Sequence, residues 1–412
     1  MQENIDAKKK ENKITILGLL IILYSMITPI ENIFLLLGGG TLSKYLGIII
    51  APFLIIYLLK RNYIIQPKII FFLIIFLIYA AISVFYSINP DYSMQGLVTL
   101  ISLIVLTILF FEAGLNSLEL RWVKISNVAL MLVVSIYMIT DTIIFGTNFG
   151  LRSSLSSAID PNVFASSIAI PVLIVLDWRF KKNIKSNLIF FLIIGVFLMA
   201  IVMTGSRGGL LALLLSSFAF IFLHLKKPFM SKILYIFFIG LFILLPLYLF
   251  MNIFLPDIAS RFTLESVLST GGTGRTKIWE NYLNIFSKSY LSNIFFGNGY
   301  YSHGYVYESV FGKVVASHNE FISFLIDFGL FGLIIIIAIY FVILKQAYQT
   351  RNIIGISIVI ALVAAGFGLD IIFRKFFWNA IFIVILESQI KLEVSTQIET
   401  DTSTTKNIST NI

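Results

Sequence analysis

The sequence has no cysteine and little charge. None of its 412 residues is cysteine, which excludes disulfides and thiol chemistry. Charged residues make up 12% of the chain, against roughly 25% in a soluble domain. Hydrophobic residues instead reach 58%, and the mean hydropathy is +0.96. This balance predicts a polytopic membrane protein.

The signatures of several enzyme classes are also missing. The chain has three histidines, and no group of histidines and carboxylates has metal-ligand spacing. A Walker A glycine loop with its lysine is absent, which excludes ATPases of that type. No two acids of the one long loop form the pair that glycosidases use: Asp257, Glu265, Glu280 and Glu308. We therefore expect no metal and no cofactor, and nothing in the chain indicates nucleic-acid binding.

Apolar stretches recur along the chain and are interpreted as membrane spans. Several reach about 18 residues or more, the length that crosses a bilayer as a helix. The N-terminal segment MQENIDAKKKENK leads directly into the first stretch without an A-x-A site, so we expect no cleavable signal peptide. The expected spans are 14–30, 43–60, 69–87, 95–114, 124–146, 162–178, 187–204, 208–224, 233–254, 319–344, 353–370 and 376–388. The predicted fold class is an all-α polytopic membrane protein with about 12 transmembrane helices.

The basic residues assign the two sides of the membrane. With the N-terminus in the cytoplasm, two thirds of the 30 lysines and arginines fall on the cytoplasmic side, in agreement with the positive-inside rule. This topology divides the chain into a first transmembrane bundle of about nine helices, an extracytoplasmic loop, a second group of transmembrane helices and a disordered cytoplasmic tail. These parts are expected at 1–254, 255–318, 319–390 and 391–412.

The long extracytoplasmic loop is expected to contain short helices. Ile278, Tyr282 and Ile285 recur at helical spacing, which predicts an amphipathic helix lying over the membrane face. The following stretch GNGYYSHGY has the glycines of a turn.

Polar residues beside the spans gather on the outer side of this topology. They occur in the stretches GLRSSLSSAIDPNVFA, TGSRGG and ASHNEFISFLIDFGLFG and at the start of the loop helix. The residues concerned are Arg152, Asn162, Arg207, Arg275, His318 and Asn319. Their common side is the evidence, from the residues alone, for one site.

Arg207 allows two interpretations. An arginine at the end of a span commonly extends its side chain to lipid headgroups. Gly205, Ser206 and Gly208, however, allow a ligand to approach the backbone closely. A helix start that donates N–H groups beside a fixed guanidinium suits a phosphate.

The other candidates also have structural alternatives. Arg275 could be a solvated helix residue, and Arg152 could form a salt bridge with Asp160. His318 could be a helix cap or a packed residue. The positive end of a helix dipole and nearby arginines favour the neutral imidazole, which accepts a proton as a general base does.

Four segments together resemble the O-antigen ligase and polymerase family (the Wzy and WaaL type). They are TGSRGGLLALLL, TGRTKIWENYLNIF, GNGY and SHNEFISFLIDFGLFG, and DPNVFASSIAIPVLI is similar to an earlier segment of that family. The resemblance covers about 150–335. It implies a metal-independent glycosyltransferase that uses an undecaprenyl-diphosphate-linked oligosaccharide on the outer face of the cytoplasmic membrane.

The resemblance also implies roles for residues of this chain. Arg207 and Arg275 match the two arginines that hold the diphosphate, and His318 matches the histidine that activates the acceptor hydroxyl. Substrate contacts are further expected from Arg152, Asn162, Ser206, Asn319 and Asp327. Two arginines would supply the charge that many soluble enzymes obtain from a metal. The reaction would be a single displacement with inversion, in which the acceptor hydroxyl attacks the anomeric carbon.

The acceptor separates the two main functional hypotheses. A polymerase adds to a second lipid-linked glycan, whereas a ligase uses lipid A core, a wall polymer or a protein. The abundance of Ile, Phe, Lys and Asn is typical of an AT-rich genome and favours a capsular or exopolysaccharide polymerase. A flippase and a chain-length regulator are expected partners, beside the acceptor glycan and membrane lipids. A polysaccharide flippase or transporter is the alternative from another class.

Overall fold

The computed structural model describes residues 13–33, 41–59, 66–145, 160–263, 265–266 and 274–409. Within these ranges the chain is helical and contains no strand. The helices of the first half are α2 (Ile16–Ile27), η1 (Thr28–Ile33), α3 (Leu42–Leu59), α4 (Pro67–Val84), α5 (Pro90–Ala113), α6 (Ser117–Phe145), α7 (Pro161–Phe180), α8 (Asn187–Thr204) and α9 (Arg207–His224). Those of the second half are α10 (Phe229–Phe254), α11 (Pro256–Ser260), α13 (Arg275–Ser287), α14 (Leu291–Phe296), α15 (His303–Phe311), α16 (Glu320–Gln349), α17 (Ile353–Gly366) and α18 (Lys375–Ser409).

The helices agree with the predicted membrane spans. Eight of the described helices are long and apolar enough to cross a membrane, and α2, α4 and α17 are shorter apolar helices. Every expected span overlaps a helix of the structure, and most of the ends differ by a few residues. The predicted all-α polytopic membrane fold is therefore confirmed.

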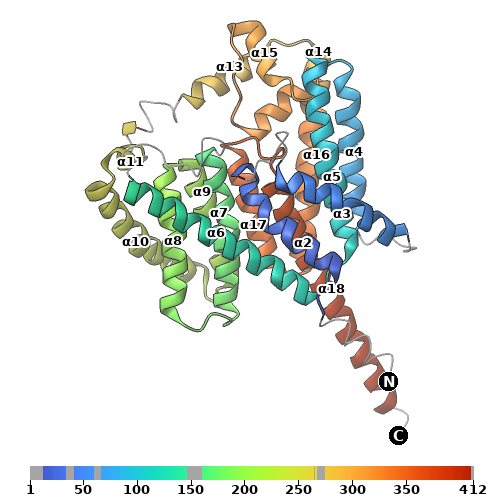
Figure 1. Ribbon diagram of the computed structural model, residues 1–412, viewed down its shortest axis with the longest axis vertical. Coiled ribbons are helices and arrows are strands. Elements are labelled where there is room, and N and C mark those ends of the chain that lie inside the picture. Colours follow the sequence, from blue (N-terminus) through green and yellow to red (C-terminus); the bar gives the residue numbers. More distant parts are fainter. Residues whose placement is uncertain are drawn as a thin grey trace.

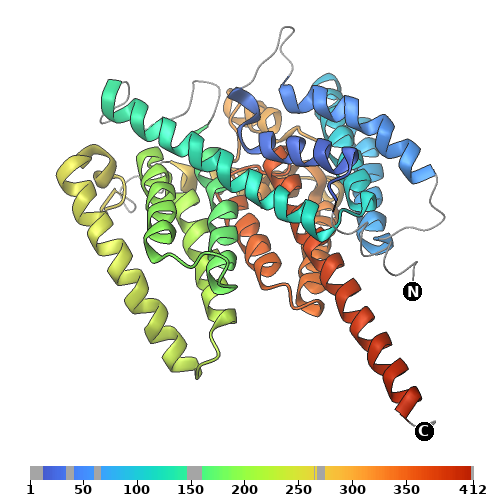
Figure 2. The same cartoon turned by 60° about the horizontal axis from the view of Figure 1, so that its bottom comes forward.

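Helix α18 extends past the last expected span. That span is 376–388, whereas α18 begins at Lys375 and continues to Ser409; the disorder of the tail 391–412 stays a prediction. This segment contains neither glycine nor proline, the residues that usually end a helix. The last turns of α18 extend away from the bundle (Figures 1 and 2).

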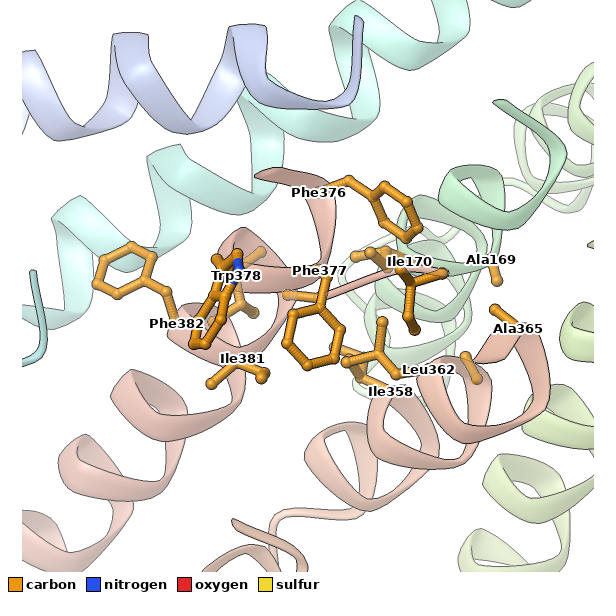
Figure 3. Close-up of a cluster of buried hydrophobic side chains, with 14 of the residues drawn as sticks. Ala169, Ile170, Ile358, Leu362, Ala365, Phe376, Phe377, Trp378, Ile381 and Phe382 are labelled. Atoms are coloured by element: carbon orange, nitrogen blue, oxygen red, sulfur yellow. The ribbon is translucent and has the colours of Figure 1, made fainter. Parts of the chain in front are cut away.

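Helix α7 lies at the centre of the bundle and α10 at its edge. Every residue of α7 from Phe164 to Asp177 is buried, as expected of a helix that is apolar on all sides. In α10 only Met251 is buried, and both views place this helix at the periphery (Figures 1 and 2). Figure 3 shows side chains of α7, α17 and α18 meeting in one apolar cluster, with Phe377 of α18 beside Leu362 of α17.

Gly209 brings the first turn of α9 against α7. A Cβ atom at this position would lie 2.5 Å from the Cβ atom of Ala165 and 2.9 Å from its carbonyl carbon. Real Cβ atoms do not approach backbone this closely, so only glycine fits here. This contact fixes the position of the chain at Arg207, two residues earlier.

The GNGY turn is attached to a break in α16. The backbone of α16 leaves the helical conformation at Gly329, where φ is 65°. Carbonyl oxygens before the break accept hydrogen bonds from outside the helix: Asn298 N to Ile326 O (2.9 Å), Gly299 N to Asp327 O (3.0 Å) and the Tyr79 hydroxyl to Phe328 O (2.8 Å). Because unpaired carbonyls are costly in an apolar environment, the first two contacts hold the turn on α16, and the third joins α4 to the break.

The described loop helices α13, α14 and α15 form a small unit at one end of the bundle (Figure 1), called here the loop domain. Tyr282 is fully buried in it beside Val306 and Tyr307, and Ile278 and Ile285 pack against this cluster. The predicted helix with an apolar face at 278, 282 and 285 is therefore present. The loop domain carries Arg275 and leads directly to His318.

Candidate functional site

The turn between α8 and α9 presents Arg207. Gly205 ends α8 in the left-handed conformation, with φ of 58°, and the Ser206 hydroxyl accepts a hydrogen bond of 3.2 Å from Gly209 N. Arg207 is the first residue of α9. Its Nη1 atom is buried and has no hydrogen-bond partner in the described part of the chain. An unpaired buried guanidinium nitrogen is unfavourable unless a ligand binds it.

Arg275 approaches the same turn from the loop domain. It is the first residue of α13, and Gly274 precedes it with φ of 81°. A Cβ atom at Gly368, after α17, would lie 3.3 Å from Arg275 Nη1 and 3.9 Å from the Cα atom of Gly208. The Arg275 guanidinium therefore lies beside the first turn of α9, close to Arg207. Residues about 70 positions apart in the sequence meet here because α9, α13 and the end of α17 converge.

The charges around Arg275 are mixed. Burial lowers the pKa of Arg275, Asp160 and Asp370 raise it, and Arg207 and Arg261 lower it. Asp160 caps α7 and accepts hydrogen bonds from Asn162 N at 2.7 Å and Asn162 Nδ2 at 2.9 Å. No ion pair joins Arg207, Arg261 or Arg275 to a carboxylate within the described ranges.

His318 is held in an unusual backbone conformation. Its φ is 51°, in the left-handed region that non-glycine residues seldom adopt. Both neighbours are fixed: Trp279 Nε1 donates a 2.9 Å hydrogen bond to Ser317 O, and Asn319 Oδ1 caps α16. Such a conformation costs about 1–3 kcal/mol and persists where the surroundings enforce it, often at functional sites.

The surroundings of His318 favour its neutral form. Burial lowers its pKa below the usual 6.5, and the positive charge of Arg275 lowers it further. Asp370 and Asp160 oppose this effect without reversing it. Within the described residues no hydrogen bond to the imidazole ring is formed, so the ring is available to accept a proton near pH 7.

Asp370 also lies beside the candidate site, although no sequence motif contains it. It lies between α17 and α18, and its Oδ1 atom accepts hydrogen bonds from the Ser323 hydroxyl at 2.5 Å and the Ser317 hydroxyl at 3.4 Å. Its negative charge raises the pKa of both Arg275 and His318. The only signal in the sequence was an acid near the outer end of an expected span.

Two predicted substrate-binding residues cap helices, and a third bonds to a cap. Ser206 caps α9, Asn319 caps α16, and the Asn162 amide donates to Asp160 at the start of α7. Each therefore fixes the start of a helix beside the site. Whether they also contact substrate stays a prediction. Arg152 and its suggested salt bridge to Asp160 lie outside the residues that the structure describes.

Asp327 lies deeper in α16 and its oxygens are already bound. Oδ1 accepts hydrogen bonds from Ser302 N at 3.0 Å and His303 N at 2.6 Å, and Oδ2 lies 3.0 Å from His303 Nδ1. Burial alone would lower the pKa of His303, but Asp327 raises it to about 9. These contacts give Asp327 a structural role, to hold α15, and lend no support to its predicted role in substrate binding.

The carboxylate oxygens of Glu320 also accept hydrogen bonds from within the protein. Its oxygens accept hydrogen bonds from the Tyr340 hydroxyl at 2.9 Å, from Ile371 N at 3.0 Å and from Ile372 N at 3.1 Å. Glu320 thus fixes the connection between α17 and α18, which carries Asp370.

Comparison with known proteins supports a family for part of the chain. No curated protein matches the chain. Residues 191–337 match the family described as O-antigen ligase. The matched segment begins in α8, ends in α16 and includes Arg207, Arg261, Arg275 and His318. The resemblance noted in the sequence is thus confirmed over residues 191–337, and this match supports an O-antigen ligase/polymerase family for the chain.

Proposed function

We propose that the protein polymerises lipid-diphosphate-linked oligosaccharide repeat units into a surface polysaccharide, on the outer face of the cytoplasmic membrane. The observation that carries the proposal is the convergence of Arg207, Arg275 and His318. They come from α9, from the loop domain and from the start of α16, and they meet at one end of the membrane bundle. The O-antigen ligase match supports this class of reaction.

The two arginines hold the diphosphate of the donor. Each lies at the start of a helix, where N–H groups also favour an anion. Guanidinium groups bind phosphate oxygens in pairs, and each charge-assisted hydrogen bond contributes about 1.5–3 kcal/mol. As the sugar leaves the diphosphate, negative charge grows on the bridging oxygen, and the arginines stabilise it without a metal.

His318 accepts the proton of the acceptor. In one displacement the acceptor hydroxyl oxygen bonds to the anomeric carbon, and the bond from this carbon to the diphosphate oxygen breaks. The hydroxyl proton passes to the imidazole of His318, and the configuration at the anomeric carbon inverts. A general base of this kind contributes roughly 10²–10⁴-fold to a rate.

The membrane position of Arg207 follows from the substrate. A polyprenyl chain anchors the diphosphate at the bilayer surface, so its binding groups belong at the ends of membrane helices. The positive-inside distribution supports the outer face for this end of the bundle. The acceptor is proposed to be a second lipid-linked glycan. A flippase that delivers the units and a chain-length regulator are proposed as partners.

The proposal is tested with purified protein in liposomes that contain the lipid-linked repeat unit. Glycans longer than one unit, together with released undecaprenyl diphosphate, are expected, and EDTA should not reduce their formation. Transfer only to added lipid A core, wall polymer or protein would identify a ligase instead. Movement of the donor between leaflets without transfer would identify a flippase. Activity that EDTA removes and Mg²⁺ restores would contradict the metal-independent mechanism.

A further inference from the structure

We propose that Arg261 is a third arginine of the diphosphate site, one that also positions the turn carrying Arg207. This inference rests on the function proposed above and extends it, because three guanidinium groups suit a diphosphate better than a monophosphate. Arg261 directly follows α11 and belongs to none of the motifs singled out in the sequence.

The backbone around Arg261 is anchored in the apolar core. Ile258 and Ala259 are buried, and Phe262 packs against the core of the bundle. Arg261 N donates a 3.1 Å hydrogen bond to Ile258 O. The start of the Arg261 side chain is thus set by packing.

The Arg261 side chain reaches the α8–α9 turn. Its Nε atom donates a hydrogen bond of 3.3 Å to the carbonyl oxygen of Gly205, two residues before Arg207. The guanidinium therefore lies at the turn whose backbone starts α9. A shift of this turn would displace Arg207.

Three positive charges meet here, and the charges of Asp160 and Asp370 offset them only in part. The positive charges of Arg207 and Arg261 both lower the pKa of Arg275. None of the three arginines forms an ion pair in the described part of the chain. Like charges placed together repel, most strongly where water is partly excluded. An anion with several negative oxygens relieves this repulsion, and a diphosphate has more of them than a monophosphate. The buried Nη1 atom of Arg207, which has no hydrogen-bond partner among the described residues, lies in the same cluster.

A simpler role for Arg261 needs only its hydrogen bond. Basic side chains often bind the last carbonyls of a helix, and Gly205 ends α8. That contact uses Nε alone, and no other hydrogen bond from the Arg261 side chain occurs within the described ranges. A helix cap requires only a hydrogen-bond donor at position 261, whereas a phosphate site also requires the positive charge of the guanidinium. Glutamine keeps a donor and removes the charge, so it separates the two roles.

The experiment measures binding of inorganic pyrophosphate and inorganic phosphate to the purified full-length protein in detergent. The wild-type protein should bind pyrophosphate more tightly than phosphate. Arg261→Gln should raise the Kd for pyrophosphate about tenfold, a loss of ~1.4 kcal/mol, and change the Kd for phosphate less. The Kd of Arg261→Lys for pyrophosphate should lie between those of the wild type and Arg261→Gln. Lys288→Gln removes an exposed charge of the loop domain and should bind pyrophosphate as the wild type does.

Thermal unfolding distinguishes the outcomes. Arg261→Gln should unfold near the wild-type temperature, and Arg261→Ala should unfold lower because it loses the bond to Gly205. If Arg261→Gln binds pyrophosphate as the wild type does, Arg261 is only a helix cap and the inference is wrong. If Arg261→Gln does not fold, wild-type pyrophosphate affinity in Arg261→Ala overturns the inference equally. Failure of the wild-type protein to bind pyrophosphate would instead overturn the proposed function, and the role of Arg261 with it.

Discussion

Trp279 Nε1 donates a 2.9 Å hydrogen bond to the carbonyl oxygen of Ser317, the residue before His318. Trp279 lies one helical turn after Arg275 on α13. The bond therefore joins the helix that carries Arg275, the proposed phosphate-binding arginine, to the segment that carries the proposed base. The distance between the two groups is set by this contact and by the packing of the loop domain.

Trp279→Phe should lower the transfer rate and leave the fold intact. Phenylalanine keeps most of the apolar contact but has no donor, so Ser317 and His318 are less firmly held. Loss of one hydrogen bond costs about 0.5–1.5 kcal/mol of stability, whereas a displacement of about 1 Å at a reacting group can cost 10²-fold in rate. Rate and thermal unfolding are measured together. If the transfer rate falls only as much as the fraction of folded protein falls, Trp279 has no positioning role.

Arg207→Lys and Arg275→Lys should each lose most activity at normal expression. Lysine keeps the positive charge but lacks the planar pair of donors that binds two phosphate oxygens. The length distribution of the glycan in cells measures the effect, with Lys288→Arg as the matched control in the loop domain. Near-normal polymer from Arg207→Lys would favour a side chain that reaches only to lipid headgroups.

The His303–Asp327 pair should make the stability of the protein depend on pH. The folded-state pKa of His303 is raised to about 9, above its unfolded value of about 6.5. The stabilisation is therefore complete below about pH 6.5 and is lost as the pH rises through 9, on the order of 3 kcal/mol in total. The unfolding temperature of His303→Gln should be lower at pH 6 and approach that of the wild type near pH 9.5. Parallel curves for the two proteins across this range would contradict the pairing.

The absence of cysteine allows a direct test of the topology. Ser292→Cys lies at an exposed position of α14, and Asn183→Cys lies in the exposed turn between α7 and α8. A membrane-impermeant maleimide should label the first in intact cells and the second only after lysis. The opposite pattern would place the site on the cytoplasmic side and remove the lipid-linked donor from its reach.

The membrane helices could be predicted because each is a long apolar run bounded by charge. Arg207 and Arg275 could be proposed as site residues from their motifs and their common side of the membrane. Asp370 and Arg261 could not be predicted as site residues, because each is a single charged residue in a segment that connects two helices. Only the packing of α9, α11 and the α17–α18 connection brings them to the site.

The break in α16 could not be predicted from the sequence either. The stretch FISFLIDFGLFGLI reads as one apolar helix, in which an isolated glycine is tolerated. The break at Gly329 depends on Gly297, whose added Cβ would lie 2.2 Å from Asp327 O. Two glycines 32 positions apart must meet for the turn to reach α16, and no local pattern encodes such a contact.

The most direct test of the account is the fate of the lipid-linked repeat unit in cells that carry His318→Ala. If His318 is the base, this variant should insert, bind the donor through its arginines and fail only in transfer. Unpolymerised units should therefore accumulate on the lipid, while His224→Ala, altered at the far end of α9, should give a normal ladder. A normal ladder of glycan lengths from His318→Ala, at wild-type expression, would contradict the central claim.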